Sequence, residues 1–587
     1  MSAAYKEEAG VASDPFGQSR TVFEELLART STSRALAASH AEVEEDIGRS
    51  GRALLRQLFQ DHLDLRHSQE RRVVVRDERG VQLPERRRAR RQLRSLLGPV
   101  TVARFLYQEG GREGRAPADA RLRLCDDGYS MGVRREVAQL CARDAYAPAL
   151  ETLERLTGAH VPQRQAEQLV RRAAEDVASF YERRTQEPVP REPLLILSFD
   201  AAGIVMRTDS LRDDTRKKAL AEPRERAFPP KLKSGEKPNR KRMAQLGSVY
   251  QVAPFIRTAD DIVGELQSLT KGGSTEPRPS RPRPLNKRVF GSIAKVASSV
   301  IDEGFREALS RDPQRKRRWI VLLDGNDEQL QAVKRAARRC RASIAIVVDL
   351  IHLIEYLWSA AYCFHPAGSD DARDWVVQRV RSFLTPGADP AQLAAGMRRS
   401  ATRRSLERRT AVDDCAAYIL KLAPYMRYGE AIALGLPIAT GVIEGACRHL
   451  VRRRLGIGGA RGSTAGAEAI LLLRATVLSE DFDAYWQHHE NEVFRRTHGA
   501  RYRGPIPERV RSVDDTRDET LFQGESSSAK RRAVDDEAWN MALRPKTKLR
   551  QSERLEWCFI NQWHSAGFLC DPCFGRRPVT FSESRIL

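Results

Sequence analysis

The sequence predicts an α/β protein whose sheet is interrupted by a long helical segment and preceded by a mainly helical N-terminal region. Segments 326–340 and 350–362 have the spacing of amphipathic helices. Residues 364–436 carry helical patterns and no run of comparable strand quality. Strands that alternate with helices in this way are typical of an α/β sheet. The apolar runs that predict the strands occur at 194–200, 203–207, 248–256, 319–324 and 344–349.

The chain has 587 residues, too many for one compact core, so we expect several regions. They are a helical and partly disordered segment (1–70), short strands followed by helices (71–190), the first part of the α/β core (191–363), an all-helical insertion (364–436), the second part of the core with a strong helix (437–500), and a polar, flexible C-terminal extension (501–587).

The chain is strongly basic, with a net charge of +22, and arginine dominates runs such as "ERRRARRQLR". Guanidinium groups make two-point contacts with phosphate oxygens, so this surplus favours a nucleic-acid partner. A GC-rich genome that uses arginine wherever a cation is tolerated would give a similar composition without such a partner.

The sequence contains neither a secretory signal nor an uncharged apolar run of about 18 residues, so we expect no membrane partner. The nine cysteines are scattered, and only Cys570 and Cys573 form a CxxC pair, with no second pair to complete a zinc site. This pattern favours a reducing compartment. Together with the basic charge, it leads us to expect a cytoplasmic, nucleoid-associated protein.

A possible helix-turn-helix occurs in the N-terminal region, at "LTGAHVPQRQAEQLV". A glycine turn is followed by Val161-Pro162, which opens a helix with Arg164, Arg171 and Arg172 on its outward side. These arginines are candidate DNA contacts. A plain helical hairpin fits the same residues equally well.

Three aspartates stand at the ends of apolar runs: Asp200 in "LLILSFDAAG", Asp324 in "RRWIVLLDGN" and Asp349 in "SIAIVVDLIH". The carboxyl end of a buried strand lies at the mouth of an α/β sheet, where ligand sites usually form. Taken alone, each aspartate could be an ordinary turn residue or a helix cap, and Asn326 could cap the helix that follows Asp324.

A fourth acid, Glu444, lies in the first turn of the helix predicted in "PIATGVIEGACRHLVRRRL", with Thr440 or Gly441 as its N-cap. Arg448 and Arg452 follow at helical spacing, so a surface ion pair is the simpler explanation of Glu444 alone. Two strand-end aspartates and a helical glutamate, however, are the acids that an RNase H-like nucleotidyltransferase needs. They would hold two Mg²⁺ or Mn²⁺ ions per active site, about 3.5–4 Å apart.

Several ordered segments resemble the ISKra-four group of bacterial insertion-sequence transposases. They are "DAAGIVMR", "LRDDTRKKA", "EKPNRKRMAQLGSVYQVAPFIRT", "VLLDGNDEQ", "IVVDLIHLIEYLWSAAYCF" and "PIATGVIEGACRHLVRRRL", and the resemblance covers roughly residues 90 to 500. These are DDE enzymes with an RNase H-like core. The resemblance implies that Asp200, Asp324 and Glu444 are the catalytic, metal-holding acids. Asp349 is the rival for the second aspartate.

The resemblance also implies double-stranded DNA as the partner, bound through the region 71–190 and through the core. His352 in "VVDLIH" would contact DNA or pack in the core. The further candidate DNA contacts in the core are Arg240, Lys241, Arg242, Arg448, His449, Arg452 and Arg453. The chain departs from the family pattern in lacking cysteines in "FLYQEGGREGRAPADARLRL" and in having Gly462 where an aromatic residue commonly follows "GAR".

We therefore expect a DDE transposase that binds the terminal inverted repeats of its element and then cuts and joins DNA strands. Cleavage and joining need two ends held together, so a homodimer or larger assembly is expected. Two alternatives stay open. One is a DNA-binding protein descended from a transposase that no longer turns over, and the other is a structure-specific nuclease with the same two-metal core.

Overall fold

The computed structural model describes residues 14–71, 73–109, 114–184, 194–221, 241–271, 281–456, 462–502 and 506. Within this part, the chain forms two compact units. Unit 1 contains the residues up to Asp176 together with those that follow Ala484, and unit 2 contains Val177–Asp483. Helices and strands occur in both units, so the protein is a mixed α/β protein, as the sequence predicts.

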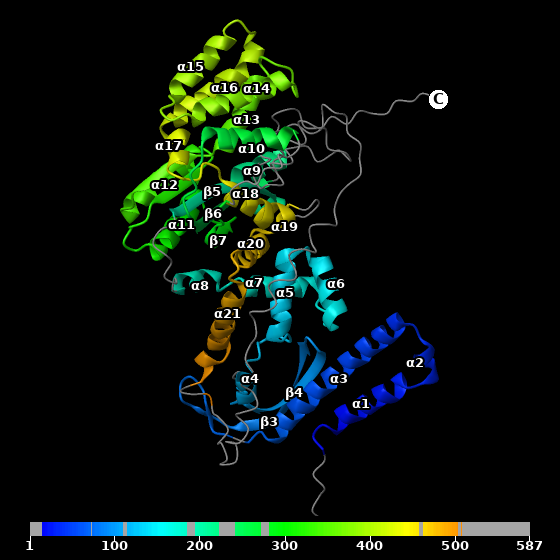
Figure 1. Ribbon diagram of the computed structural model, residues 1–587. Coiled ribbons are helices and arrows are strands. Elements are labelled where there is room, and N and C mark those ends of the chain that lie inside the picture. The colour runs from blue at the N-terminus through cyan, green and yellow to red at the C-terminus, as the bar shows by residue number, and fades with distance from the viewer. Residues whose placement is uncertain are drawn as a thin grey trace, which may run out of the picture. The chain divides into compact units, whose positions relative to one another are not determined.

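A five-stranded mixed sheet forms the centre of unit 2 (Figure 1). Its strands lie in the order β7-β6-β5-β8-β9. β5 pairs antiparallel with β6 and parallel with β8. β6 pairs antiparallel with β7, and β8 pairs parallel with β9. Every residue of β8 is buried, as expected for a central parallel strand that is covered on both faces. The strands are β5 (Leu194–Val205), β6 (Lys241–Val252), β7 (Leu285–Ser292), β8 (Trp319–Leu323) and β9 (Ile344–Val348).

The strands predicted at 319–324 and 344–349 are confirmed, whereas other parts of the sheet differ from the prediction. The runs 194–200 and 203–207 form one continuous strand, β5, because Ala201, Ala202 and Gly203 stay in register with β6. The sequence predicts a long loop over 209–243 and an exposed Pro/Arg-rich segment as far as Lys287. At the margins of these stretches the structure instead has helix α9 (Asp213–Ala221), a β6 strand that begins at Lys241, and β7 from Leu285. Residues 222–240 and 272–280 lie outside the described residues.

Helices pack around this sheet. α11 (Ala297–Arg311) contacts β5, β6 and α12 (Asp327–Cys340), and α20 (Thr464–Leu478) contacts β7. α13 (Leu350–Ala361) follows β9, and α10 (Ala259–Lys271) packs on the helix α14 described below. The helices predicted at 326–340 and 350–362 are therefore confirmed.

Residues 364–436 are helical and contain no strand, as predicted. In Figure 1, α14, α15 and α16 lie on one side of α13 and the sheet lies on its other side. One hydrophobic core continues from the sheet through α13 into these helices, and it includes Leu195, Leu353 and Ile419. The helical segment therefore shares the core of the sheet. Its helices are α14 (Asp370–Leu384), α15 (Pro390–Ala401), α16 (Leu406–Leu422) and α17 (Tyr428–Ala433).

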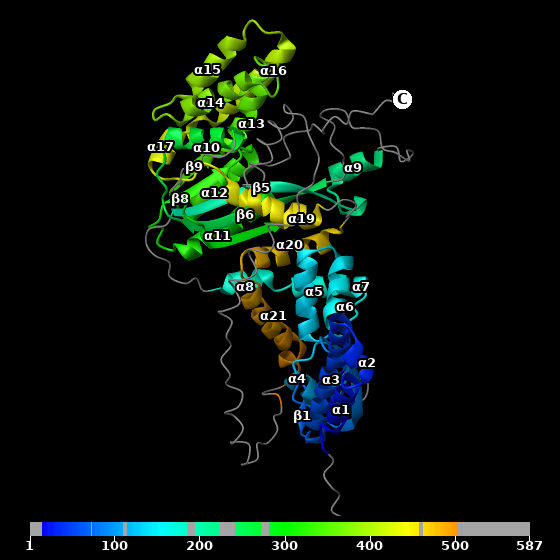
Figure 2. The same cartoon turned by 45° about the vertical axis from the view of Figure 1, so that its right-hand side comes forward.

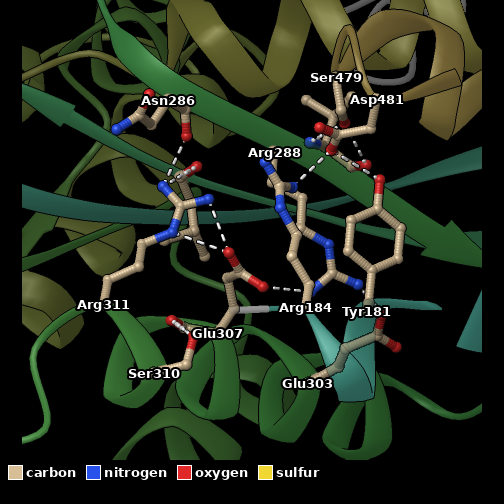
Figure 3. Close-up of polar contacts among 12 residues, drawn as sticks. Tyr181, Arg184, Asn286, Arg288, Glu303, Glu307, Ser310, Arg311, Ser479 and Asp481 are labelled. Carbon is tan, nitrogen blue, oxygen red and sulfur yellow. Dashed lines mark hydrogen bonds and ion pairs between the residues drawn. The ribbon is translucent and has the colours of Figure 1, made fainter. Parts of the chain in front are cut away.

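A buried network of charged side chains lies beside β7 (Figure 3). The Glu307 carboxylate on α11 accepts hydrogen bonds from Arg288 on β7 at 2.5 Å and from Arg311 at 2.8 Å. The Arg288 guanidinium also lies 3.6 Å from the centre of the Tyr181 ring on α8 (Val177–Arg183). The Tyr181 hydroxyl donates to Asp481 at 3.0 Å. The network therefore connects β7 and α11 to two segments near the start and the end of unit 2.

Unit 1 contains two antiparallel ribbons, one made by β1 (Val75–Arg76) and β2 (Gln82–Leu83), and one by β3 (Glu85–Ser95) and β4 (Gly98–Tyr107). The helices predicted within residues 1–70 are confirmed. One of the short strands that the sequence predicts in 71–190, at "ADARLRL", is wrong, because the first residues of this stretch belong to helix α4 (Pro117–Arg121). The basic run "ERRRARRQLR" is strand β3. The helices of unit 1 are α1 (Gly17–Thr30), α2 (Ser33–Ala37), α3 (His40–Ser68), α4, α5 (Met131–Arg143), α6 (Tyr146–Thr157), α7 (Gln163–Ala173) and most of α21 (Phe482–Thr497).

Among the described residues, no helix is both long enough and apolar enough to cross a membrane. Nearly all of the C-terminal extension expected at 501–587, with Cys570 and Cys573, lies outside the described residues.

Candidate active site

Asp200 lies in the middle of β5, one step beyond the end of its neighbour β8. The pairing of β5 with β8 runs from Leu195↔Trp319 to Ser198↔Leu322, so Asp200 stands at the edge where the parallel strands end. Its Oδ2 atom accepts a hydrogen bond from the Cys447 thiol, with a sulfur–oxygen distance of 3.0 Å. Burial, and then the charge of Asp324, raise the pKa of the Asp200 carboxyl.

Asp324 directly follows β8 and is partly exposed at the same edge of the sheet. Its Oδ1 atom accepts the backbone N–H of Asn326 at 3.0 Å, and its carbonyl oxygen accepts the Tyr418 hydroxyl at 2.9 Å. Gly325 has φ +95°, and a Cβ atom there would lie 2.3 Å from Leu422, so this turn requires glycine. Asn326 caps α12 by accepting the N–H of Gln329. The turn thus holds Asp324 in place while another residue caps the helix.

Asp349 is deeply buried, with 3% of its surface exposed, and it acts as the N-cap of α13. One carboxylate oxygen accepts the N–H of Ile351 at 2.9 Å, and the other accepts the hydroxyl of Thr440. Burial raises the pKa of Asp349 to about 6 although both hydrogen bonds lower it. Both oxygens are therefore engaged in holding the fold, in contrast to the partly exposed Asp324.

Glu444 lies in the short helix α18 (Gly441–Ala446), which packs against β5 and β6 (Figure 2). Its side chain is buried, with 8% of the residue exposed, and within the described residues its Oε2 atom has no hydrogen-bond partner. Burial, followed by the charges of Asp349 and Asp200, raises the pKa of Glu444 to about 10. A buried carboxylate without a compensating partner is costly, and a cation bound beside it would remove that cost.

The predicted acids thus come together in pairs. The charge of Asp324 raises the pKa of Asp200, and the charges of Asp349 and then Asp200 raise the pKa of Glu444, so these acids lie near one another. Among the described residues, no group of three His, Cys, Asp or Glu side chains is already arranged around a metal position. The donor set nevertheless fits a hard divalent cation, because it consists of carboxylate oxygens and includes the unpartnered Oε2 of Glu444.

The helix that carries Glu444 differs from the single strong helix that the sequence predicts. α18 passes into a π-helical segment, η3 (Cys447–Arg452), and then into α19 (Arg453–Leu455). π-helical turns inside α-helices often occur at functional sites, because they shift side chains from the regular face. Here the segment directs Cys447 to Asp200. The sequence shows no sign of this contact, since Cys447 looks like one more buried apolar residue of the helix.

His352 lies on α13 and is mostly buried, with 19% of its side chain exposed. Its Nδ1 atom lies 3.1 Å from Glu355 Oε2, and its ring makes edge contacts with Tyr356 and Tyr418. Burial lowers its pKa, but the Glu355 hydrogen bond and the nearby charges of Asp324 and Asp349 raise it overall. Of the two roles that the sequence left open for His352, these contacts favour packing behind the acids.

The basic side chains near Glu444 differ in their freedom to contact DNA. Arg453 is exposed, while Arg448, His449 and Arg452 are partly buried. Burial and the charges of Arg453 and Arg448 lower the pKa of His449 to about 4, so His449 is neutral near pH 7.

Of the three DNA contacts predicted at 240–242, Arg240 lies outside the described residues. Lys241 is exposed at the start of β6. The Arg242 guanidinium donates to the carbonyl oxygens of Ile293 at 2.9 Å and Ser210 at 3.3 Å, so it is occupied within the unit.

In unit 1, the residues of the possible helix-turn-helix form α6 and α7, joined by a five-residue turn in which Gly158 has φ +73°. Arg164, Arg171 and Arg172 on α7 are exposed, as predicted. Arg171 pairs weakly with Glu167 at 3.8 Å, and Arg172 pairs with Asp127 at 2.9 Å.

Comparison with known proteins gives no match: no protein-family model matches the chain, and no curated protein does so either.

Proposed function

We propose that this chain is a DDE-type DNA transposase that binds the ends of its element and catalyses metal-dependent strand cleavage and strand transfer. The observation that carries the proposal is the buried, unpartnered carboxylate oxygen of Glu444, which lies within electrostatic reach of Asp200. Folding a chain around such a group costs free energy, and a functional site is a common reason for that cost.

The sheet supports an RNase H-like core. Numbered along the chain, its strands lie in the order 3-2-1-4-5, and only the second strand runs against the others. Asp200 on the first strand and Asp324 after the fourth are neighbours because β5 and β8 are paired. Residues 364–436 would be the all-helical insertion between the fifth strand and the helix that carries Glu444.

Asp200, Asp324 and Glu444 would hold two Mg²⁺ or Mn²⁺ ions. Bound there, divalent ions supply activation of water or a 3′-hydroxyl and stabilisation of the leaving oxygen in an in-line attack on phosphate. The chain's own residues position these acids: Cys447 donates to Asp200, Tyr418 and Gly325 fix the turn at Asp324, and α18 presents Glu444 from the facing side. Arg453 and Lys241, both exposed, would contact DNA phosphates.

The region 71–190 would be the DNA-binding region, and a homodimer or larger assembly would hold two DNA ends. No membrane partner is proposed. A cytoplasmic, nucleoid-associated location would follow from a DNA substrate.

The proposal is tested by strand cleavage and joining on duplex DNA that carries the sequences flanking the gene, with Mg²⁺ or Mn²⁺. We expect the wild-type chain to cleave at the ends and to join the released 3′-hydroxyl to target DNA. Glu444→Gln, which keeps the size of the side chain, should bind the same DNA and do neither.

A DNA-binding protein that has lost catalysis is the second candidate, because the described acids are not already grouped around one metal position. Binding of the ends without cleavage in either metal would establish that candidate. Cleavage without any joining would establish a nuclease instead.

A further inference from the structure

Strand β3 carries a row of exposed basic side chains along one face of a two-stranded ribbon. Arg88, Arg90, Gln92 and Arg94 occupy every second position and are all exposed. The alternate positions turn toward the interior, where Leu93 and Ser95 are buried. Since side chains alternate between the two faces of a strand, the four exposed residues share one face.

On the other face of the ribbon, the arginines are paired with an acid. Arg91 and Arg104, which lie on adjacent strands, both pair with Asp119, at 3.4 Å and 2.9 Å. In the described part of the chain, Arg88 and Arg90 have no such acidic partner. The ribbon thus compensates the charge of the arginines that it partly buries, whereas the charges of the exposed Arg88 and Arg90 are not neutralised by an acid of the described residues.

The neighbouring strand adds no charge to this face. Opposite Arg88 it has Phe105, whose ring centre lies 5.6 Å from the Arg88 guanidinium. The residues directly opposite Arg94, Gln92 and Arg90 are Pro99, Thr101 and Ala103, which are small and uncharged. Side chains two residues apart on a strand are separated by about 6.7 Å, close to two nucleotide steps of duplex DNA, whose charges on one strand lie about 3.4 Å apart along the axis. The major groove of duplex DNA, about 12 Å wide, accepts a two-stranded ribbon.

The row leads into a cleft of about 700 Å³ within unit 1, to which α7 contributes Gln165, Gln168 and Arg172. Gln92 and Arg94 line the same cleft. Arg94 is held in place there by the Tyr129 ring, 5.7 Å away, and by the carbonyl oxygen of His160, at 3.0 Å. In the major groove, arginine can bond to the edge of guanine and glutamine to the edge of adenine.

We propose that this surface, the β3 row together with the adjoining face of α7, binds the major-groove side of duplex DNA. The row supplies phosphate contacts, and the cleft supplies contacts to base edges. This inference rests on the proposed function, since the DNA would be the element's end. In this proposal the main DNA contact is made by the β3–β4 ribbon, whereas the sequence predicted it for helix α7 alone.

The test measures DNA binding by the full-length chain, using fluorescence anisotropy with a labelled duplex of the flanking sequence at several salt concentrations. The variant is Arg88→Gln/Arg90→Gln, and the matched control is Arg49→Gln/Arg52→Gln, which removes the same charge from exposed positions on α3. Circular dichroism confirms that both variants are folded.

We expect the ribbon variant to bind at least about tenfold more weakly than the control near physiological salt. Its plot of log affinity against log salt should lose about two units of slope, because two phosphate contacts are gone. Equal binding by ribbon variant, control and wild type would overturn the inference, whether or not the chain cleaves DNA.

Two further outcomes separate the inference from the proposed function. Loss of binding in the ribbon variant, together with a wild type that binds but never cleaves, would uphold the surface and refute the transposase. An RNA duplex that competes as well as the DNA duplex would overturn the groove contact, because the major groove of A-form RNA is too narrow for a ribbon.

Discussion

The thiol of Cys447 donates a hydrogen bond to Oδ2 of Asp200 over 3.0 Å, which links the π-helical segment after Glu444 to the strand that carries the first acid. The helical segment that carries Glu444 is thereby tied to Asp200 through one side chain, that of Cys447. The contact fixes the orientation of Asp200, so Cys447 is a positioning residue.

Replacement of Cys447 tests this positioning role. Cys447→Ala removes the donor, and we expect the Mn²⁺ concentration that gives half-maximal cleavage to rise by about tenfold, as is usual when a residue that orients a metal ligand is lost. Cys447→Ser restores a donor and should recover most of the affinity for Mn²⁺. If the alanine and serine variants needed equal Mn²⁺, the hydrogen bond would have no positioning role.

Asp324 and Asp349 should differ in what they do for stability. Asp349→Ala removes an N-cap and leaves the Thr440 hydroxyl buried without its acceptor, so we expect the free energy of unfolding to fall by about 2–4 kcal/mol. Asp324→Ala removes only one turn hydrogen bond and should cost about 1 kcal/mol or less. Urea unfolding of the two variants measures both values, and a reversed order would contradict the structural role of Asp349.

The pH dependence of stability should reveal the cost of ionising the buried Glu444 carboxyl. Its pKa is raised from 4.5 in the unfolded chain to about 10 in the folded chain. Between these values the folded chain keeps a proton that the unfolded chain releases, so the free energy of unfolding falls as pH rises from about 4.5.

Glu444→Gln has no such proton. Without divalent ions, the variant should therefore gain stability relative to the wild type as pH rises from 5 to 8. Saturating Mn²⁺ should reverse the order, since only the wild type keeps the carboxylate. Urea unfolding at several pH values, with and without Mn²⁺, makes the comparison; parallel curves in the absence of metal would show that Glu444 is not strained.

The buried network beside β7 should depend on Glu307, which lies between two arginines (Figure 3). Glu307→Gln leaves Arg288 and Arg311 without their shared carboxylate, and we expect a loss of about 3–5 kcal/mol in the free energy of unfolding. Glu303→Gln is the matched control, because Glu303 also pairs with Arg288, at 2.7 Å. The Glu303 side chain is 22% exposed, so its loss should cost about 1 kcal/mol. Equal losses in both variants would mean that the burial of Glu307 does not determine how much its ion pairs stabilise the fold.

The sequence predicted strands best where a short run of apolar residues is also buried in the sheet. β8 and β9 are short apolar runs that end at Asp324 and Asp349, and both are strands. β7 was not predictable in this way, because it begins with "LNK" after a Pro/Arg-rich stretch and is buried by tertiary contacts with β6 and α20. β3 was equally obscure, since Arg91 on its inner face looks solvated until Asp119 of α4 is placed beside it.

The sequence allowed acids to be proposed for the candidate site but gave no information on their surroundings. A helical pattern continues through Glu444 to Leu455, and no periodicity distinguishes the π-helical segment that directs Cys447 to Asp200. The choice of Asp324 over Asp349 stays a prediction, because both follow apolar strands. Only the hydrogen bonds from Thr440 and Ile351 show that the carboxylate of Asp349 is already engaged.

The most direct test of the central claim is the single-turnover rate of strand cleavage on the element's own ends, with Asp200→Asn, Asp324→Asn, Glu444→Gln and Asp349→Asn compared with wild type at equal folded fraction. We predict that the first three variants lose at least about 1,000-fold in rate, because each removes a metal-holding carboxylate, while Asp349→Asn keeps a measurable rate. Retention of cleavage by Asp324→Asn together with its loss in Asp349→Asn would contradict the assignment, and no cleavage by the wild type in either metal would contradict the catalytic account as a whole.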